Sequence, residues 1–346
     1  MQKIIFHIDV NAFFTSVEEI YNPVLKTKPI GICNNNSKAV LCTCNYAARQ
    51  YGVTAAMNAS KAKKLCPQII FIKPKMHLYE KISQHFMDLI RTKYTTEVEI
   101  ASIDECYVDV SEIIDKYHNN PIILATQMQN LLLNKLNLPV SIGISNSKYF
   151  AKIASDFKKP LGIYTLYKSE IKEKFWNLPI ENFYGIGNKK IHVLHELGIH
   201  TILEFKNYVD QDKLKLIFHN QYFKIMDIIN GNINDDIVIS EQAIKTLSKA
   251  NTFLKAEVDL ERIFYELEKV VKKLTIELEK NFLLGKCLTL MIKTNNHKIV
   301  SKSKTFTNNI DHKNLFNLAK NLFIEIWDEQ VEIKYLSLGI SKLQHA

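Results

Sequence analysis

The chain has 346 residues, a net charge of +9 and a hydrophobic fraction of 47%. This composition is ordinary for a soluble globular protein, and it excludes a disordered, collagen-like or coiled-coil chain. The length exceeds that of a typical single domain, so we expect more than one domain.

Membrane and secretion signals are not evident in the sequence. No apolar run reaches the ~20 residues that a membrane-spanning helix needs, and the N-terminal apolar run meets Asp9 too early for a signal peptide. The six cysteines show no paired C-x-x-C spacing, which favours reduced thiols over a zinc site or disulfides. We therefore expect a cytoplasmic protein.

The first half of the chain mixes strands and helices. Residues 3–8 form a compact apolar run that predicts a buried strand, and a helix is expected to start near Asn11. Further strands are expected at both ends of 98–110 and over 140–144, and further helices over 60–65, 78–90, 122–136 and 146–156. Because strands and helices do not alternate strictly, the pattern predicts an α+β domain with a partly antiparallel sheet.

The second half divides into a helical and a mixed part. Residues 170–240 are rich in helical patterns, and a polar stretch at 231–241 has the character of a linker. The last hundred residues predict strands at 246–256, 286–293, 298–306 and 332–341, with one helix after the first strand and one before the last. That order is βαββαβ, a ferredoxin-like arrangement.

Two acidic clusters stand at the ends of expected strands. Asp9 ends the first strand, and Asp104 and Glu105 lie between the two strands of 98–110. Carboxylates on neighbouring strands repel one another unless a cation neutralises them, and two Mg²⁺ ions there would suit a phosphoryl transfer. Each acid taken alone is more often a solvated turn or cap residue than a catalytic one.

Six segments together resemble the Y-family translesion DNA polymerases. Residues 9–19 (Asp-Val-Asn-Ala-Phe-Phe-Thr-Ser-Val-Glu-Glu) and 101–107 (Ala-Ser-Ile-Asp-Glu-Cys-Tyr) resemble the two metal-binding motifs of that family. The other similar segments, in the family's order, are 44–53, 141–148, 151–162 and 184–187. The resemblance covers nearly the whole chain and weakens after about residue 205.

The resemblance implies roles for individual residues of the active site. Asp9, Asp104 and Glu105 would be catalytic and would hold two Mg²⁺ ions, with the carbonyl of Val10 as a further ligand. Phe14 matches the steric gate that excludes a 2′-hydroxyl, and Phe13 beside it would also be partly a core residue. Tyr46, Arg49 and Lys159 match the residues that bind the triphosphate. Asn11, Ala12 and Cys106 depart from the family's usual residues, and none of them replaces a metal ligand.

DNA contacts are expected in two places. Gly185, Ile186 and Gly187 form a turn before a helix, as in a helix-hairpin-helix, with Lys189 and Lys190 adding charge. A two-residue strand period puts Lys298, Lys302 and Lys304 on one face, which is either a phosphate-binding face or a solvated edge. Basic residues outnumber acidic ones in 1–167 and 241–346 but not in 168–240, so a polyanion would be bound from both ends of the chain.

The resemblance implies a multidomain right-hand polymerase of the α+β class. Its parts would be a ferredoxin-like palm (1–18 and 78–166), small fingers (19–77), a helical thumb with the helix-hairpin-helix (167–233), a linker (234–241) and a βαββαβ little finger (242–346). The expected reaction is error-prone, template-directed addition of dNMP from dNTP to a primer 3′ end, in DNA damage tolerance and repair.

Other partners and other functions stay open in the sequence. The expected partners are primer–template DNA and dNTPs, with no membrane. The chain ends directly after the last expected strand with no evident clamp-binding tail, which leaves a sliding clamp undecided. The alternatives are a nucleotidyl cyclase, which would need no helix-hairpin-helix, and a catalytically dead DNA-binding subunit, against which the three acids argue.

Overall fold

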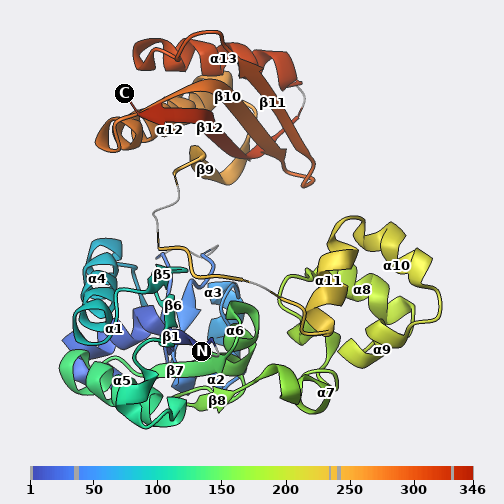
Figure 1. Cartoon of the computed structure of the whole chain (residues 1–346). Coiled ribbons are helices and arrows are strands. Elements are labelled where there is room, and N and C mark those ends of the chain that lie inside the picture. The colour runs from blue at the N-terminus through green and yellow to red at the C-terminus, as the bar shows by residue number, and fades with distance from the viewer. Residues whose placement is uncertain (1–2, 35–38, 234, 240–242, 329–330, 346) are drawn as a thin grey trace. The chain divides into compact units, whose positions relative to one another are not determined.

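The computed structural model describes residues 3–34, 39–233, 235–239, 243–328 and 331–345. The chain divides into two compact units, Met1–Ser240 and Glu241–Ala346 (Figure 1). The division falls inside the expected linker 234–241, of which residues 234 and 240–241 lie outside the described residues. Residue 242, the first of the expected little finger, lies outside them too.

A five-stranded sheet is the centre of the first unit. Its strand order is β5-β6-β1-β7-β8, and β1 lies between two antiparallel neighbours, β6 and β7. The strands are β1 (Ile5–Val10), β5 (Val98–Ile100), β6 (Glu105–Asp109), β7 (Val140–Ser145) and β8 (Ile163–Thr165). The helices that pack on the two faces of this sheet are α1 (Phe13–Tyr21), α4 (Met76–Lys93), α5 (Pro121–Leu136) and α6 (Lys148–Asp156).

The two faces of this sheet differ in character. Phe6, Ile8 and Val10 of β1 pack into one buried cluster with side chains of α1, α4 and α5. Successive strand residues point to opposite faces, so His7 and Asp9 lie on the other face. Helix α6 covers part of that second face. The sequence therefore builds an apolar layer on one side and a polar site on the other.

Gly143 in β7 lets α6 lie very close to the sheet. A Cβ added there would stand 1.9 Å from the carbonyl oxygen of Ala151 and 2.3 Å from the backbone nitrogen of Ser155. Backbone atoms cannot give way at such distances, so only glycine fits. The close approach brings the polar side chains of α6 down onto β1.

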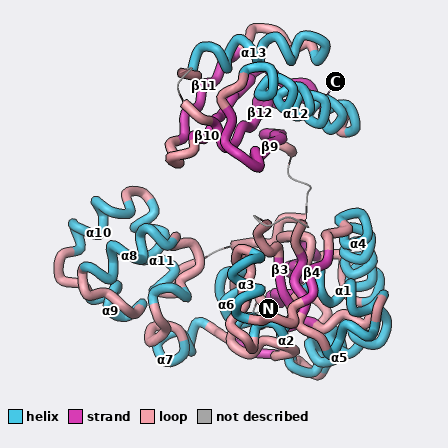
Figure 2. The backbone as a smooth tube through the Cα atoms, turned by 180° about the vertical axis from the view of Figure 1, so that it is seen from behind, coloured by secondary structure: helices cyan, strands magenta, loops and turns pink. Residues whose placement is uncertain are grey.

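A small three-stranded sheet and a helical region complete the first unit (Figure 2). The sheet has the order β3-β2-β4 and its own buried cluster, in which Leu41 and Ile69 are examples. Its strands and helices are β2 (Ile30–Ile32), β3 (Thr43–Cys44), α2 (Tyr46–Arg49), α3 (Ala59–Leu65) and β4 (Ile70–Ile72). The helical region contains α7 (Ile171–Lys174), α8 (Asn188–Glu196), α9 (Ile202–Asn207), α10 (Gln211–Phe218) and α11 (Gln221–Ile229).

The helical region shares a core with α6. Phe150, Ile153 and Ala154 of α6 belong to the same buried cluster as Phe183 and Phe205 of the helical region. One face of α6 packs against the central sheet, and another face packs against the helices that follow it in the chain.

The second unit has the expected βαββαβ order. Its four-stranded sheet runs β11-β10-β12-β9, all antiparallel, and both helices pack on one face. The elements are β9 (Thr246–Glu257), α12 (Leu260–Lys280), β10 (Leu283–Thr294), β11 (Ile299–Thr305), α13 (Leu315–Ile326) and β12 (Ile333–His345).

Most expected elements are confirmed, with small shifts at their ends. Helix α1 starts at Phe13 rather than near Asn11, because Ala12 has a left-handed backbone conformation with φ of 49°. Helix α6 starts at Lys148, since the Ser147 side chain accepts a hydrogen bond from Phe150 N and caps it. The short strands β2, β3, β4 and β8 were not expected. No helix in the described ranges is long and apolar enough to cross a membrane.

Candidate active site

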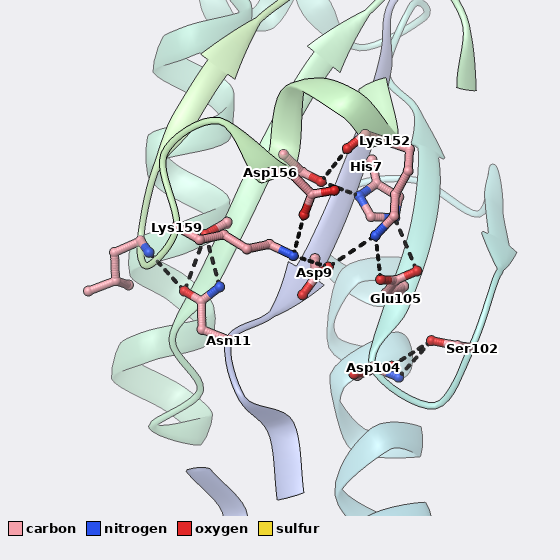
Figure 3. Close-up of polar contacts among 12 residues, drawn as sticks. His7, Asp9, Asn11, Ser102, Asp104, Glu105, Lys152, Asp156 and Lys159 are labelled. Atoms are coloured by element: carbon pink, nitrogen blue, oxygen red, sulfur yellow. Dashed lines mark hydrogen bonds and ion pairs between the residues drawn. The ribbon is translucent and has the colours of Figure 1, made fainter. Parts of the chain in front are cut away.

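Asp9 and Glu105 are direct partners across two antiparallel strands. Asp9 stands near the end of β1 and pairs with Glu105, the first residue of β6. Paired residues on adjacent strands point to the same face, so the two carboxylates lie side by side on the face that α6 covers (Figure 3). The backbone pairing alone brings together two acids that are 96 positions apart in the sequence.

Two lysines neutralise this pair. Lys152 of α6 lies between the acids, with its Nζ 2.6 Å from Glu105 Oε1 and 3.3 Å from Asp9 Oδ2. Lys159 follows α6 and places its Nζ 2.6 Å from Asp9 Oδ2 and 2.7 Å from Asp156 Oδ1 (Figure 3). Ammonium groups thus stand against both carboxylates.

The surroundings move the pKa values of the two acids apart. Burial raises the pKa of the Asp9 carboxyl above its ordinary value, and the opposing attraction of Lys159 does not cancel this effect. Burial acts in the same direction on Glu105. There, the interactions with His7, Asp9 and Lys152 outweigh burial and hold the pKa of Glu105 below its ordinary value.

Asp104 turns toward its own loop. Its Oδ1 accepts a hydrogen bond from Ser102 Oγ at 2.6 Å, and its carbonyl oxygen accepts one from Val10 N at 3.0 Å. Within the described part of the chain, no three His, Cys, Asp or Glu side chains converge closely enough to hold a metal ion. The three acids are therefore neighbours that do not share a common centre in this arrangement.

The donor set nevertheless fits a hard divalent cation. Asp9 and Glu105 offer carboxylate oxygens, which Mg²⁺ prefers. Both carboxylates are already bound by positively charged nitrogens at 2.6 Å, which shows that positive charge is stabilised at this point of the sheet.

One pocket of about 250 Å³ collects the residues that the sequence predicted for substrate and metal. Its lining includes all nine of them, namely Asp9, Val10, Phe13, Phe14, Tyr46, Arg49, Asp104, Glu105 and Lys159. Two unexpected residues also line it: Thr43 in β3 and Cys42, which comes just before that strand. The small sheet thus contributes to the lining of the same pocket.

The two phenylalanines at the start of α1 have different surroundings. Phe13 is 2% exposed and belongs to the apolar cluster, whereas Phe14 is only partly buried. Two adjacent helical residues point about 100° apart, so they cannot face the same core. Phe14 is therefore the partly exposed ring of the two in the pocket lining.

Arg49 and Tyr46 form a unit on α2. The guanidinium carbon of Arg49 lies 4.6 Å from the centre of the Tyr46 ring, and Arg49 Nε donates to the Cys44 carbonyl at 3.2 Å. Among the described residues, the buried Tyr46 hydroxyl has no hydrogen-bond partner. A guanidinium held in this way is suited to bidentate binding of a phosphate.

The sequence reasoning missed several residues that contact the acids or their neighbours, among them His7, Lys152 and Ser155. One of them carried a signal, because His7 is two residues before Asp9 and a strand period of two places both on one face. Lys152 and Ser155 are brought to the site by the packing of α6 against Gly143.

The expected helix-hairpin-helix turn is present and open. Gly185 has a φ of +107°, a conformation that favours glycine, and a Cβ added at Gly185 or Gly187 would meet nothing within 4 Å. Lys189 is exposed, whereas Lys190 Nζ donates to Gln221 at 2.6 Å and lies 4.6 Å from the Phe218 ring centre. Lys190 is thus engaged within the helical region.

The lysines of β11 lie on the helix-covered side of the second sheet. Lys302 and Lys304 pair with Leu290 and Leu288, which are core residues, so all four point to one face. Lys302 Nζ lies 2.5 Å from Glu325 of α13. Lys298 precedes the first residue of β11.

Comparison with known proteins gives consistent matches over both units. Residues 8–156 match the impB/mucB/samB family, and residues 244–346 match the impB/mucB/samB family C-terminal domain. The chain is 34% identical to DNA polymerase IV of Ureaplasma parvum serovar 3 over 99% of its own length and 95% of the relative. It is 33% identical to DNA polymerase IV of Oceanobacillus iheyensis over 99% of its own length and 81% of the relative.

Solved structures agree with the fold. A Y-family DNA polymerase chimera, Dbh-Dpo4(243-245)-Dbh, matches with a TM-score of 0.87 and 24% identity over 99% of this chain and 100% of that one. DinB from Sulfolobus solfataricus matches with a TM-score of 0.64 and 26% identity over 98% of both chains.

Proposed function

The chain belongs to the impB/mucB/samB family of Y-family DNA polymerases, and from that premise we propose that Asp9, Asp104 and Glu105 form its catalytic centre. The family makes the protein a DNA-directed DNA polymerase of the translesion type that acts in DNA repair. DNA and nucleotides are its substrates, and it depends on a divalent metal ion.

The pairing of Asp9 with Glu105 carries this proposal. The two carboxylates are register partners, and each is already neutralised by a lysine at 2.6 Å. Asp104, the neighbour of Glu105, lines the same pocket, and rotation of its side chain away from Ser102 would bring a third carboxylate to the pair.

We assign two Mg²⁺ ions to this centre, held by Asp9, Asp104, Glu105 and the Val10 carbonyl. Bound there, they would neutralise the charge that develops on the attacking and leaving oxygens of phosphoryl transfer. Asp9 and Glu105 lie on paired strands of the central sheet, so the backbone positions of these two residues are fixed before substrate binds. The primer 3′ oxygen would attack the α-phosphate of the nucleotide, and pyrophosphate would leave.

The other pocket residues are proposed to hold the nucleotide. Arg49 is positioned by its contacts with Tyr46 and Cys44 to bind phosphate oxygens, and the nearby Tyr46 hydroxyl has no partner among the residues that the structure describes. Lys159, whose amine contacts Asp9, would also be close enough to bind a phosphate that the metal ions hold beside that carboxylate. Phe14 would pack against the sugar, and Phe13 supports it from the core.

The domain roles follow the buried clusters. We propose a palm at 1–18 and 78–166, fingers at 19–77, a thumb at 167–233, a linker at 234–241 and a little finger at 242–346. Separate clusters in the central sheet, the small sheet, the helical region and the second unit support this division. We propose DNA contacts at Gly185, Ile186, Gly187, Lys189 and Lys190 of the thumb and at Lys298, Lys302 and Lys304 of the little finger.

Two further expectations are part of the proposal. A cytoplasmic location follows from the DNA and dNTP substrates of a bacterial type of enzyme. We also include a sliding clamp among the proposed partners. The nucleotidyl cyclase and the inactive subunit lose their support, because the chain aligns along nearly its whole length with polymerases and keeps all three acids.

Primer extension on undamaged and abasic templates tests the proposal. We expect extension by the wild-type enzyme with Mg²⁺ and its loss on chelation with EDTA. Asp9→Ala and Asp104→Ala should abolish extension, because each removes a ligand from a centre worth several kcal/mol of transition-state stabilisation. Binding of primer–template in a gel-shift assay should persist in both variants. Full extension by Asp104→Ala would show that the catalytic centre lies elsewhere.

A further inference from the structure

We propose that Lys152 is a resident counter-cation of the Asp9–Glu105 pair, which holds the two carboxylates together before metal binds and gives up its contacts when a divalent ion arrives. The inference rests on the proposed function, in which both acids are metal ligands. It assigns a positioning role to a lysine that lies outside the proposed metal ligands and nucleotide contacts.

The ammonium group of Lys152 joins the two acids. Its Nζ donates to Glu105 Oε1 at 2.6 Å and to Asp9 Oδ2 at 3.3 Å (Figure 3). The side chain of Lys152 is only 13% exposed, and that of Asp9 only 9%. Water screens charges poorly at such a site, so two neighbouring carboxylates without a cation would repel each other strongly. One ammonium group in contact with both acids offsets that repulsion.

The packing of α6 places Lys152 at the pair. Lys152 follows Ala151, whose carbonyl oxygen lies so close to Gly143 that only glycine fits there. Gly143 belongs to β7, which pairs with β1, the strand that carries Asp9. The lysine and the acid are therefore positioned by the same helix-on-sheet contact.

Lys159 differs from Lys152 in its choice of partners. Lys159 is 24% exposed and contacts Asp156 at 2.7 Å as well as Asp9. It therefore keeps an acidic partner when it leaves Asp9 for a phosphate. Within the described residues, the ion pairs of Lys152 are those with Asp9 and Glu105 alone. Lys152 is thus dedicated to the two proposed ligands.

The positive charge of Lys152 competes with a metal ion. The two acids and the two lysines that contact them carry formal charges that sum to zero. An ion held by the carboxylate oxygens that Lys152 contacts would stand beside its ammonium group, and two cations repel each other where screening is weak. Lys152 therefore weakens metal binding in the free enzyme. A triphosphate adds negative charge, so metal binding is favoured once a nucleotide is present.

Lys152 stays charged throughout. Burial favours its neutral amine, but the attraction of Asp9 and the hydrogen bond with Glu105 outweigh burial and raise the pKa of Lys152 above its ordinary value. On metal binding the contacts of Lys152 change, and its protonation does not.

Binding of Mn²⁺, followed by the loss of the free-ion EPR signal, tests this role without catalysis. The enzyme is used in complex with primer–template that ends in a dideoxynucleotide, and no nucleotide is added. Lys152→Met keeps the length of the side chain and removes its charge, so Mn²⁺ should bind at least about tenfold more tightly than to the wild type. Lys152→Arg keeps the charge and should stay close to the wild type. Lys148→Met is the matched control and should leave the affinity unchanged, because Lys148 lies in the same helix and pairs with Glu99.

Urea denaturation distinguishes this role from a purely structural one. In EDTA, Lys152→Met should be less stable than the wild type, because two buried carboxylates lose their shared cation. Mn²⁺ should then stabilise this variant more than it stabilises the wild type, since an ion that binds only the folded state stabilises it more when it binds more tightly. A lysine with a purely structural role would cost the same stability with and without Mn²⁺.

The wild-type enzyme offers a measurement that needs no variant. In ¹⁵N NMR of the complex with primer–template, the coupling through the hydrogen bond between Lys152 Nζ and the Glu105 carboxyl carbon should be present without metal. It should be lost when Mg²⁺ is added to saturation. A coupling that persists would overturn the inference. If Lys152→Met does not fold, this measurement decides.

Two further variants separate this inference from the function on which it rests. If Asp9→Asn and Glu105→Gln leave Mn²⁺ binding unchanged, the proposed ligands themselves are wrong. If both variants weaken Mn²⁺ binding, while Lys152→Met binds Mn²⁺ no more tightly than the wild type, the acids remain ligands and the role of Lys152 is overturned.

Discussion

The ring of Phe14 lies flat against the ring of Tyr79, with the centres 4.4 Å apart and 14° between the planes. Tyr79 is fully buried in α4, and its hydroxyl donates to Glu18 Oε1 at 2.8 Å. The other oxygen of Glu18 accepts from Lys75 at 2.6 Å. The Tyr79 ring is therefore fixed by burial and by the hydrogen bond of its hydroxyl. Phe14 packs on this ring and forms a rigid wall of the pocket.

The first prediction is that Phe14 decides which sugar the enzyme accepts. A 2′-hydroxyl adds one heavy atom, so only a rigid apolar surface at van der Waals distance rejects it well. Phe14→Ala should raise ribonucleotide incorporation strongly and lower deoxynucleotide incorporation only modestly. Single-nucleotide insertion kinetics with dNTP and rNTP measure the ratio, with Phe14→Tyr as the variant that keeps the ring. An unchanged ratio in Phe14→Ala would remove Phe14 from the sugar site.

The second prediction separates Phe13 from its neighbour. Phe13 is 2% exposed and packs in the core of the central sheet, so Phe13→Ala should lower the free energy of unfolding by about 3–5 kcal/mol. Urea denaturation of both variants measures this. Phe14→Ala, at a partly buried position, is the control and should lose clearly less. Equal losses would mean that both rings serve the core.

The third prediction concerns Gly143, where α6 touches the sheet. An added Cβ would stand 1.9 Å from the Ala151 carbonyl oxygen, so Gly143→Ala must push α6 away. We expect a loss of about 1–3 kcal/mol or more in unfolding free energy, together with reduced extension, because Lys152 and Ser155 move with the helix. Gly339→Ala is the control, since its nearest neighbour, Ser248 Cβ, is 3.2 Å away. Similar losses in both variants would contradict the close packing of α6.

The sequence predicted the parts of this molecule that depend on local pattern. The apolar run before Asp9 predicted β1. The alternating stretches on both sides of Asp104 and Glu105 predicted β5 and β6 and the turn between them. The helical spacing of Phe13 and Phe14 was enough to separate a core ring from a pocket ring. In the second unit, regular apolar stripes predicted the order βαββαβ.

What the sequence could not predict depends on contacts between distant segments. Strand β3 has two residues and β2 and β4 have three each, too few to show a period. Lys152 and Ser155 reach the site only because Gly143 admits α6, which no local pattern indicates. The two-residue strand period predicted that Lys302 and Lys304 share one face of their strand. It could not predict that Lys302 pairs with Glu325, because Glu325 lies in α13, 23 positions further along the chain.

The fourth prediction addresses that basic face through the salt dependence of DNA binding. Replacing Lys298, Lys302 and Lys304 together with alanine should weaken binding about equally on all DNA sequences. The slope of log affinity against log salt should flatten by up to about 0.9 for each lost phosphate contact. Fluorescence anisotropy with a labelled primer–template at several salt concentrations gives both quantities.

Two controls distinguish a phosphate-binding face from a general loss of charge. The triple replacement of Lys269, Lys272 and Lys273 with alanine removes the same charge from α12, where Lys269 and Lys272 pair with neighbours on their own helix. This control variant should change the slope less.

Glu325→Gln should act in the opposite direction, because Lys302 lies 2.5 Å from Glu325 and must leave it to bind a phosphate. Releasing Lys302 should tighten binding, most clearly at low salt, where charge interactions are least screened. If the variant that lacks Lys298, Lys302 and Lys304 keeps the wild-type slope and Glu325→Gln does not tighten binding, the three lysines form a solvated edge of the sheet.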